Sequence, residues 1–376
     1  MDKLGKQAYT NPELMYKYRN KVPVPPLEMV DDVFCASKCG IQCVATNAAI
    51  TTFVKLKKLD LSEKKCARLH IGKKSCQDCP NLFVNGNKIK ESQKEKYLGD
   101  YLTIHANPLA TIQDRLQRGT GILSNMKALL EDIPLGSKRM EIGLTLRESW
   151  FINGTFFNSE VWCSYSKNNL KGLSILDRKI LKLALGSHSK AHSEMIYLET
   201  GCLPLENVIT ARRLLYLQTI LQRDENETIR RVYMEQKKNP CKGDWVTLIE
   251  ADMKHLEIEL TDETIASLGA DVYKKIVMTK IREKALIELQ IIQKRHLKVK
   301  HIVYKKLSES QTYLCRGSFT NKLSSLLFNL RCKVVRGIKE NFHRQFKSDL
   351  FCPFFLPRIR FTRTFISMLE IKAISW

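Results

Sequence analysis

The stretch Val24-Pro25-Pro26-Leu27-Glu28-Met29-Val30-Asp31-Asp32-Val33-Phe34 sets the expected fold of the N-terminal part of the chain. Its prolines hold the backbone extended and exclude a helix there. Beyond them, two short apolar runs flank the acidic pair Asp31-Asp32, which is a strand–turn–strand pattern. The stretch therefore predicts a β-hairpin that carries two adjacent carboxylates at its tip.

The acidic pair has a chemical and a structural interpretation. Enzymes that transfer phosphoryl groups often use two divalent cations about 3.5–4 Å apart. Hard cations such as Mg²⁺ take oxygen ligands, so carboxylates must converge on one point. An Asp-Asp dipeptide alone is weak support, because about one is expected by chance in a chain this long, and the alternative is a solvated turn.

The residues around this hairpin predict a small mixed α and β region. Apolar spacing favours a helix over residues 40–59, and residues 66–71 resume an extended pattern. Asn85-Gly86 lies between two apolar runs and predicts a hairpin, because both residues tolerate the positive φ of a tight turn. Lys96–Gly99 is expected to open a further short strand.

The remainder of the chain is expected to be helical. Strand signals nearly vanish after about residue 105, and apolar residues recur three to four apart instead. The stretches that this spacing marks are 112–130, 173–183, 214–221 and 272–292. Asn169 is a plausible N-cap for the second of these helices. The predicted fold class is α+β, predominantly helical, with a small antiparallel sheet and a helix at the N-terminus.

The charge of the chain indicates an anionic partner. Lys and Arg number 62 against 39 acidic residues, so the formal net charge is +23. Nucleic acid is the first partner to consider and an acidic membrane surface the second, while a merely soluble basic protein is the bland alternative. No run of 18 apolar residues occurs, so no membrane span is expected. Nucleic acid, and no membrane, is the partner that we expect.

The cysteines indicate an intracellular protein. Twelve are scattered through the chain, and no signal-peptide run follows Met1, so the thiols are expected to be reduced. This does not distinguish nucleus from cytoplasm. Cys76-Gln77-Asp78-Cys79 has the spacing of half a zinc site, but His70 is the only further ligand nearby, and a structural site needs four. No zinc is therefore expected.

Three segments resemble motifs of the reverse transcriptases of LINE-type (non-LTR) retrotransposons. Lys17–Asp32 (KYRNKVPVPPLEMVDD) resembles the approach to the catalytic acidic pair. The stretch from Asn47-Ala48 through Ser62–Gly72 (SEKKCARLHIG) resembles the following motif, and Lys96–Gly99 (KYLG) the primer-grip strand. The three occur in the order and spacing of that family. The resemblance continues through Phe157–Trp162 (FNSEVW) and Tyr197–Pro204 (YLETGCLP) to about residue 352.

The resemblance implies roles for individual residues in an RNA-directed DNA polymerase. Asp31 and Asp32 would hold Mg²⁺, with Asp32 closer to the primer end. Lys65 would lie near the triphosphate and protonate the departing pyrophosphate, the alternative being an exposed lysine. The primer terminus would be held by Tyr97, Leu98 and Gly99. Gly99 lets backbone approach nucleic acid closely, although a simple strand end explains it too.

The resemblance also implies a division of the chain. The expected parts are a partial palm (1–104), a thumb-like helical region (105–186), a basic helical C-terminal region (187–350) and a degenerate tail (351–376). Thumbs grip a template–primer duplex of RNA and DNA through phosphates. The basic residues expected to make those contacts are Arg115, Arg118, Lys127, Lys138, Arg139, Lys294 and Arg295. The last two belong to a basic stretch, 274–306, whose alternative is a solvated amphipathic helix.

One departure from the family bears on activity. The family's active site needs a third Asp well upstream of the pair, and Asp2 is the sole Asp before Asp31 in this sequence. Two carboxylates on one hairpin leave two metal ions short of ligands. The chain is therefore expected to be a reverse transcriptase fragment that is inactive alone, unless a second chain supplies the upstream half. The alternatives are a basic nucleic-acid-binding protein without catalysis and a translated pseudogene product.

Overall fold

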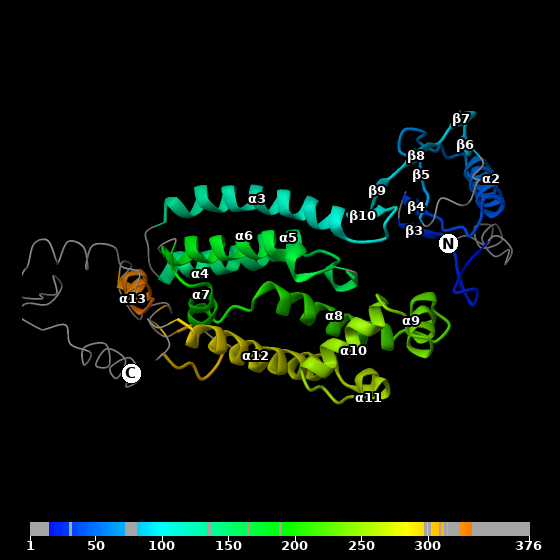
Figure 1. Ribbon diagram of the computed structural model, residues 1–376. Helices are drawn as coiled ribbons and strands as arrows, with labels where there is room; N and C mark the ends of the chain where they lie inside the picture. Colours follow the sequence, from blue (N-terminus) through cyan, green and yellow to red (C-terminus); the bar gives the residue numbers. More distant parts are fainter. Residues whose placement is uncertain are drawn as a thin grey trace, which may run out of the picture. The chain divides into compact units, whose positions relative to one another are not determined.

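The computed structural model of the protein describes residues 15–29, 32–71, 81–133, 137–163, 165–187, 190–296, 299, 302–307, 310–311, 314 and 323–332 (Figure 1). The fold is α+β and mainly helical, which confirms the predicted class. The chain divides into two compact units. Unit 1 comprises Met1–Asp114, Phe157–Asn169 and Arg212–Val277, and unit 2 comprises Arg115–Phe156, Leu170–Ala211 and Met278–Trp376.

The described strands all belong to unit 1 and form two-stranded pairs. The antiparallel pairs are β1 (Tyr16–Tyr18) with β2 (Val22–Val24), β3 (Leu27–Met29) with β4 (Asp32–Phe34), β6 (Phe83–Val84) with β7 (Asn87–Lys88), and β9 (Lys94–Tyr97) with β10 (Asp100–Thr103). β5 (Ala67–Leu69) pairs in parallel with β8 (Lys90–Ser92). The single small sheet that we predicted is thus replaced, among the described residues, by separate two-stranded ladders.

Two of the predicted hairpins are confirmed. In the first, Met29 pairs with Asp32, so the connection between β3 and β4 is only two residues long. In the second, Asn85 and Gly86 take φ values of 51° and 84° between β6 and β7. Mirror-image turns of this kind need positive φ at both central positions.

The segment Lys96–Gly99 corrects the prediction of a strand that opens there. Tyr97 ends β9, and Leu98 and Gly99 form the turn to β10 with φ values of 46° and 91°. Leucine at positive φ is uncommon because its Cβ crowds the backbone. The tight turn was not predicted because Leu-Gly is a weaker turn signal than Asn-Gly.

The first helix, α2 (Gly40–Leu56), confirms the helix predicted over residues 40–59. The side on which apolar residues recur is largely exposed, with Ile41 84% and Leu56 69% accessible. A hydrogen bond of 3.0 Å from Asn47 Nδ2 to the carbonyl oxygen of Phe83 joins α2 to β6. Periodicity thus predicted the helix correctly but not the burial of its apolar side.

Helices make up the described chain beyond Thr103. They are α3 (Leu109–Glu131), α4 (Ser137–Leu146), the π-helix η1 (Arg147–Ile152), α5 (Asn153–Thr155), the 3-10 helix η2 (Ser159–Val161), α6 (Lys167–Leu185), α7 (Ser193–Thr200), α8 (Leu205–Leu221), α9 (Thr228–Lys238), α10 (Trp245–His255), α11 (Asp262–Ser267), α12 (Ala270–Lys294) and α13 (Leu323–Arg331). The four predicted helices are confirmed as α3, α6, α8 and α12. None of the helices in the described part of the chain is long and apolar enough to cross a membrane.

The start of α6 differs from the prediction that Asn169 caps it. The helix begins at Lys167, so Asn169 lies in its first turn. Its Oδ1 accepts hydrogen bonds from the backbone N–H and the hydroxyl of Ser166, at 2.7 and 2.9 Å. Asn169 therefore accepts hydrogen bonds from Ser166, the residue before the helix, and is not itself the N-cap residue.

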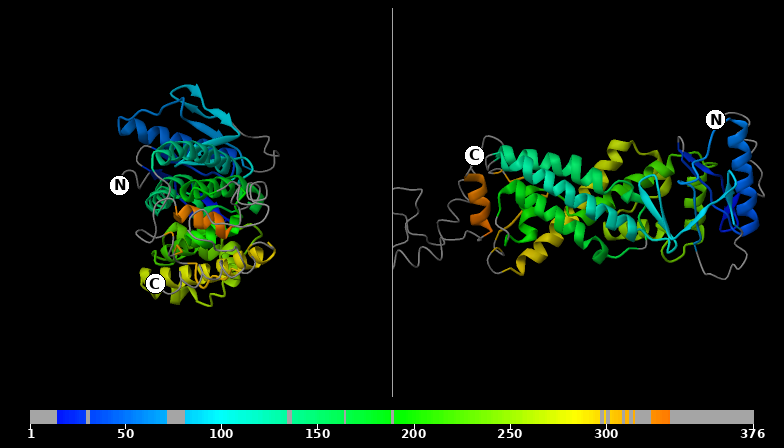
Figure 2. Two further views of the ribbon diagram at one scale, coloured as in Figure 1. Left: turned by 90° about the vertical axis from the view of Figure 1, so that its left-hand side faces the viewer. Right: turned by 90° about the horizontal axis from the view of Figure 1, so that it is seen from above.

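Close helix packing builds the core of unit 2 (Figure 2). A Cβ on Gly143 of α4 would lie 2.4 Å from the Cβ of Ala184 in α6. A Cβ on Gly172 of α6 would lie 3.0 Å from the side chain of Leu116 in α3. Glycine at these positions lets the backbones of α3, α4 and α6 approach one another.

A buried ion pair in unit 2 links η1, α6 and α7. Arg147 Nε and Nη2 donate to the two carboxylate oxygens of Asp177 at 2.6 and 3.1 Å, and Nη2 also donates to the carbonyl oxygen of Leu203 at 3.0 Å. Tyr197 donates its hydroxyl to the same carboxylate at 2.9 Å. Burial, together with the charge of Asp177, raises the pKa of the Tyr197 phenol well above its usual value. The network therefore helps to hold η1, α6 and α7 together inside unit 2.

Candidate functional site

The acidic hairpin places one of the two predicted metal ligands among the described residues. Asp32 is exposed and begins β4, directly after the turn. Asp31 lies outside the described residues. The hairpin thus carries the Asp32 carboxylate next to its tip, as the strand–turn–strand pattern predicted.

Tyr97 joins this hairpin to the predicted primer-grip segment. Its hydroxyl donates to the carbonyl oxygen of Leu27 in β3 at 3.2 Å, and its ring centroid lies 5.4 Å from that of Phe34 in β4. The pKa of Tyr97 is raised, first by burial and then by the negative charge of Asp32. The acidic hairpin and the segment that contains Tyr97 are far apart in the sequence and are in contact in the structure. The Tyr97 phenol lies close enough to Asp32 for that charge to raise its pKa.

The turn that follows Tyr97 is held from a second side within unit 1. The Leu98 carbonyl oxygen accepts a hydrogen bond of 3.3 Å from Asn158 Nδ2. Asn158 belongs to the Phe157–Trp162 segment, and Trp245 Nε1 donates to the carbonyl oxygen of Glu160 there at 2.7 Å. Gly99 has a structural reason to be glycine, because its φ is +91°. Its approach to nucleic acid stays a prediction.

Lys65, the predicted proton donor, lies apart from these contacts. It is exposed and occupies a turn in which its N–H donates to the carbonyl oxygen of Ser62 at 3.0 Å. The turn leads into β5, where Arg68 pairs with Glu91 at 3.0 Å. Among the described residues, no hydrogen bond or ion pair links the Lys65 side chain to Asp32.

The predicted duplex-binding residues fall into two groups. Those that are exposed are Arg118, Lys127, Lys138, Lys294 and Arg295. Arg115 and Arg139 are buried, and Arg115 is only 1% accessible. Arg139 donates to the carbonyl oxygens of Ile133 and Leu183 at 3.1 and 3.3 Å, and its burial lowers its pKa. These two guanidiniums are therefore internal to the helical packing, and their contact with a duplex stays a prediction.

A basic hollow beside α9 is a site that the sequence reasoning missed. Its volume is about 670 Å³. The residues that line it are Lys21, Val22, Glu225, Arg230, Arg231, Met234, Glu235, Lys237 and Lys238. Two basic dipeptides, Arg230-Arg231 and Lys237-Lys238, occur seven residues apart in α9. Seven residues are about two helical turns, so the two dipeptides lie on the same side of the helix. That spacing was a signal in the sequence, but it is short and easily passed over beside the longer basic stretch.

The hydrogen bonds around the hollow leave part of its positive charge available. Lys21 pairs with Glu235 at 2.9 Å and Lys237 with Asp262 at 2.6 Å. The Nε and Nη1 atoms of Arg230 are buried and have no hydrogen-bond partner within the part of the chain that the structure describes. Leaving such donors unsatisfied is costly, and because they are closed to solvent, Arg230 would have to turn outward before a phosphate oxygen could satisfy them.

The β1–β2 hairpin forms a wall of this hollow through Lys21 and Val22. Arg19 forms an ion pair with Asp244, and Gln236 Nε2 donates to the Tyr18 hydroxyl at 3.2 Å. The N-terminal ladder and the basic helix are thus joined within unit 1.

Comparison of the chain with protein-family models, curated proteins and solved structures found no match.

Proposed function

We propose that this chain is part of an RNA-directed DNA polymerase of the LINE type, extending from the acidic hairpin of the palm into the thumb. The observation that carries the proposal is Tyr97, which contacts β3 and β4 and leads into the Leu98-Gly99 turn. A polymerase must hold the primer end beside its metal ligands, because one metal activates the attacking oxygen of the primer. The resemblance of three ordered motifs supplies the roles proposed for these segments, including that of Tyr97.

The proposed roles follow from the type of each side chain. Asp31 and Asp32 would hold Mg²⁺, which takes carboxylate oxygens, and the exposed carboxylate of Asp32 fits that donor class. Lys65 would lie near the triphosphate and protonate the leaving pyrophosphate. Tyr97, Leu98 and Gly99 would hold the primer terminus. The partner is a template–primer duplex of RNA and DNA. We propose that Asp31 and Asp32 act together with a third carboxylate, which the family carries upstream of the pair.

Primer extension on an RNA template with Mg²⁺ tests this proposal. The purified chain is compared with an Asp31→Ala/Asp32→Ala variant, with and without a separately expressed upstream half of a LINE-type polymerase. We expect extension only when the upstream half is present, and loss of that extension in the double variant. Extension by the chain alone, abolished in the variant, would show that two carboxylates suffice. Unchanged extension in the variant would remove the catalytic role of the pair.

A second candidate function, nucleic-acid binding without catalysis, is favoured by the hollow beside α9. The cationic side chains that line it suit phosphate. Each phosphate neutralised on a duplex changes the slope of log affinity against log salt by about 0.9. Binding that persists in every catalytic variant, with no extension under any condition, would favour this function.

Duplex binding measured by fluorescence anisotropy at increasing salt tests the hollow directly. The variant Arg230→Ala/Arg231→Ala should bind more weakly and lower the salt slope by about 1–2. Arg223→Ala is the matched control, because Arg223 is exposed on the same unit but pairs with Glu227 at 3.4 Å. Equal slopes for the wild type and both variants would exclude the hollow from the interface.

A further inference from the structure

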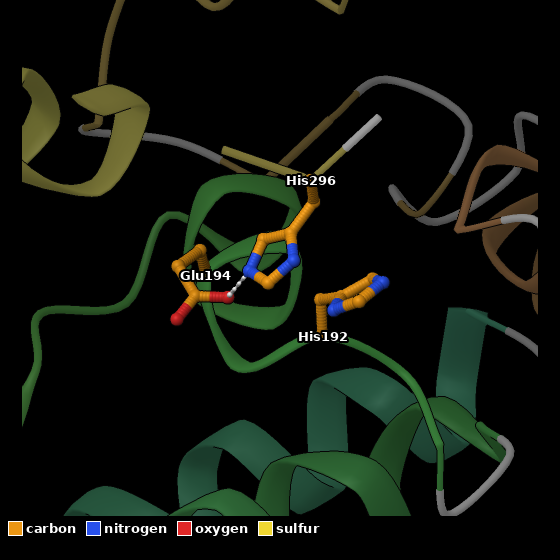
Figure 3. Close-up of side chains that lie close together, drawn as sticks. All are labelled: His192, Glu194 and His296. Carbon is orange, nitrogen blue, oxygen red and sulfur yellow. Dashed lines mark ion pairs between the residues drawn. The ribbon is translucent and has the colours of Figure 1, made fainter. Parts of the chain in front are cut away.

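Three side chains from two distant parts of unit 2 converge outside the site described above (Figure 3). His192 directly precedes α7, Glu194 lies in its first turn, and His296 follows the end of α12. The Nε2 atom of His296 lies 3.6 Å from a carboxylate oxygen of Glu194, and the two imidazole centroids are 4.1 Å apart. One ligand atom from each residue lies within 4.8 Å of the other two.

The three donors match the preferences of zinc. Two imidazoles and one carboxylate are a ligand set that Zn²⁺ accepts while keeping a fourth position open. Ligand atoms about 2.0–2.1 Å from a tetrahedral ion are about 3.3–3.4 Å apart. The 3.6 Å between His296 and Glu194 already approaches that separation, and small side-chain rotations would close the rest. Mg²⁺ fits less well, because it prefers oxygen ligands in an octahedral arrangement.

Backbone contacts fix the segments that carry the ligands. The N–H of Ile196 donates to the His192 carbonyl oxygen at 3.3 Å, and the N–H of Val299 donates to that of His296 at 3.0 Å. Gln293, at the end of α12, donates its side-chain amide to the carbonyl oxygens of Val299 and Ile302 at 2.7 and 2.9 Å. Ligands on segments held in this way lose little freedom when an ion binds.

A plain ion pair between His296 and Glu194 is the alternative. Both side chains are partly exposed, so water screens such a pair and it stabilises the fold only weakly. It also leaves unexplained why a second imidazole packs against the first. A plain ion pair needs only one imidazole, whereas one metal ion uses a lone pair from each of the two rings, whose centroids are 4.1 Å apart.

We propose that His192, Glu194 and His296 bind Zn²⁺ and thereby join the start of α7 to the segment after α12, with one coordination position open to water or an added ligand. This departs from our expectation of no zinc, which considered close Cys/His pairs along the sequence. The proposal is independent of polymerase ancestry, because none of the three residues belongs to the site described above.

Metal titration of the full chain, freed of metal by a chelator, tests the site. Zn²⁺ binding is measured by calorimetry, and Co²⁺ is used as a probe because its visible spectrum reports four-coordinate ligation. We expect one equivalent to bind, and the His192→Ala/His296→Ala variant to lose at least about tenfold in affinity, since removing a ligand costs no less than removing the group that orients it. Glu194→Gln serves if the double variant does not fold.

Two controls separate this site from other ligands. His105→Ala/His255→Ala removes two exposed histidines of unit 1, and Cys76→Ser/Cys79→Ser removes the half-site of cysteines. Both should bind Zn²⁺ as the wild type does. Loss of binding in the cysteine variant, wild-type binding in both His192→Ala/His296→Ala and Glu194→Gln, or no binding by the wild type would each overturn the proposal.

Discussion

Tyr97 shows how a single side chain connects the two segments of the candidate site. Its hydroxyl and its ring contact different strands of the acidic hairpin, and both burial and Asp32 raise its pKa. A phenol becomes anionic when it loses its proton, so any nearby carboxylate opposes that loss. The pKa of Tyr97 therefore reports how close the Asp32 carboxylate of the hairpin lies to the phenol.

Replacing Asp32 by Asn should lower the pKa of Tyr97 toward its usual value, although burial will keep part of the shift. Because the pKa is raised in the folded chain, the stability linked to Tyr97 is present below its usual pKa of about 10 and is lost as pH rises through the folded value. NMR of ring-labelled tyrosine follows the titration. Asp60→Asn, an exposed aspartate of the same unit, is the control. An identical titration in all three proteins would place Asp32 too far away to act.

Arg147 offers a second prediction at the residue scale, because it contacts one buried and one exposed carboxylate. Asp177 is fully buried, whereas Glu148 is 66% accessible and lies 3.9 Å from Nη1. Asp177→Ala leaves the guanidinium buried without its partner and should cost about 3–5 kcal/mol of unfolding free energy. Glu148→Ala should cost less than about 1 kcal/mol. Urea denaturation measures both, and similar losses would contradict the buried pairing.

At the scale of elements, two glycines in helices of unit 2 should respond oppositely to alanine. Gly121 of α3 has nothing within 4 Å of an added Cβ, so Gly121→Ala should stabilise the chain by up to about 1 kcal/mol through helix propensity. Gly143→Ala places a methyl group 2.4 Å from the Ala184 Cβ and should be destabilising by about 1–3 kcal/mol. Thermal unfolding measures the difference. Adding Ala184→Gly should restore part of the loss, and no recovery would show that α4 and α6 do not meet there.

Elements differ in how well the sequence predicts them, and the reason is local chemistry. Asn85-Gly86 identified its hairpin because both residues favour positive φ, while Leu98 concealed the next turn because leucine does not. The long helices were visible from their period. The buried contact faces were less visible, since Ile41 and Leu56 point to solvent while Arg115 is internal. Burial depends on partners far along the chain, which a local pattern does not encode.

The same limit applies to the candidate site. The acidic hairpin and Tyr97 were identified from motifs, but their contact with each other was not, because it joins distant segments. His192 and His296 lie further apart still, and no ligand role was predicted for either of them. The division into palm, thumb and C-terminal region stays a prediction, since each compact unit combines stretches from several parts of the sequence.

At the scale of the whole molecule, the net charge of +23 should make salt act in opposite directions on stability and binding. Added salt screens the repulsion among the protein's own positive charges, so the melting temperature of the free chain should rise. It also removes the advantage of counterion release, so affinity for an RNA–DNA duplex should fall steeply. Calorimetry and anisotropy over one salt series measure both. A melting temperature that falls with salt would mean that ion pairs outweigh repulsion in the folded chain.

The π-helix η1 has a consequence for how this chain tolerates insertions and deletions. A wide turn inside an α-helix accommodates one extra residue while the residues before and after it keep their faces. Losing one residue from Arg147–Ile152 would restore an ordinary α-helical turn and leave the following residues on the same side of the helix. Losing one residue from the regular helix α4 would instead rotate everything after it by about 100°. Single-codon deletions within the π-helix should therefore be better tolerated than single-codon deletions in α4.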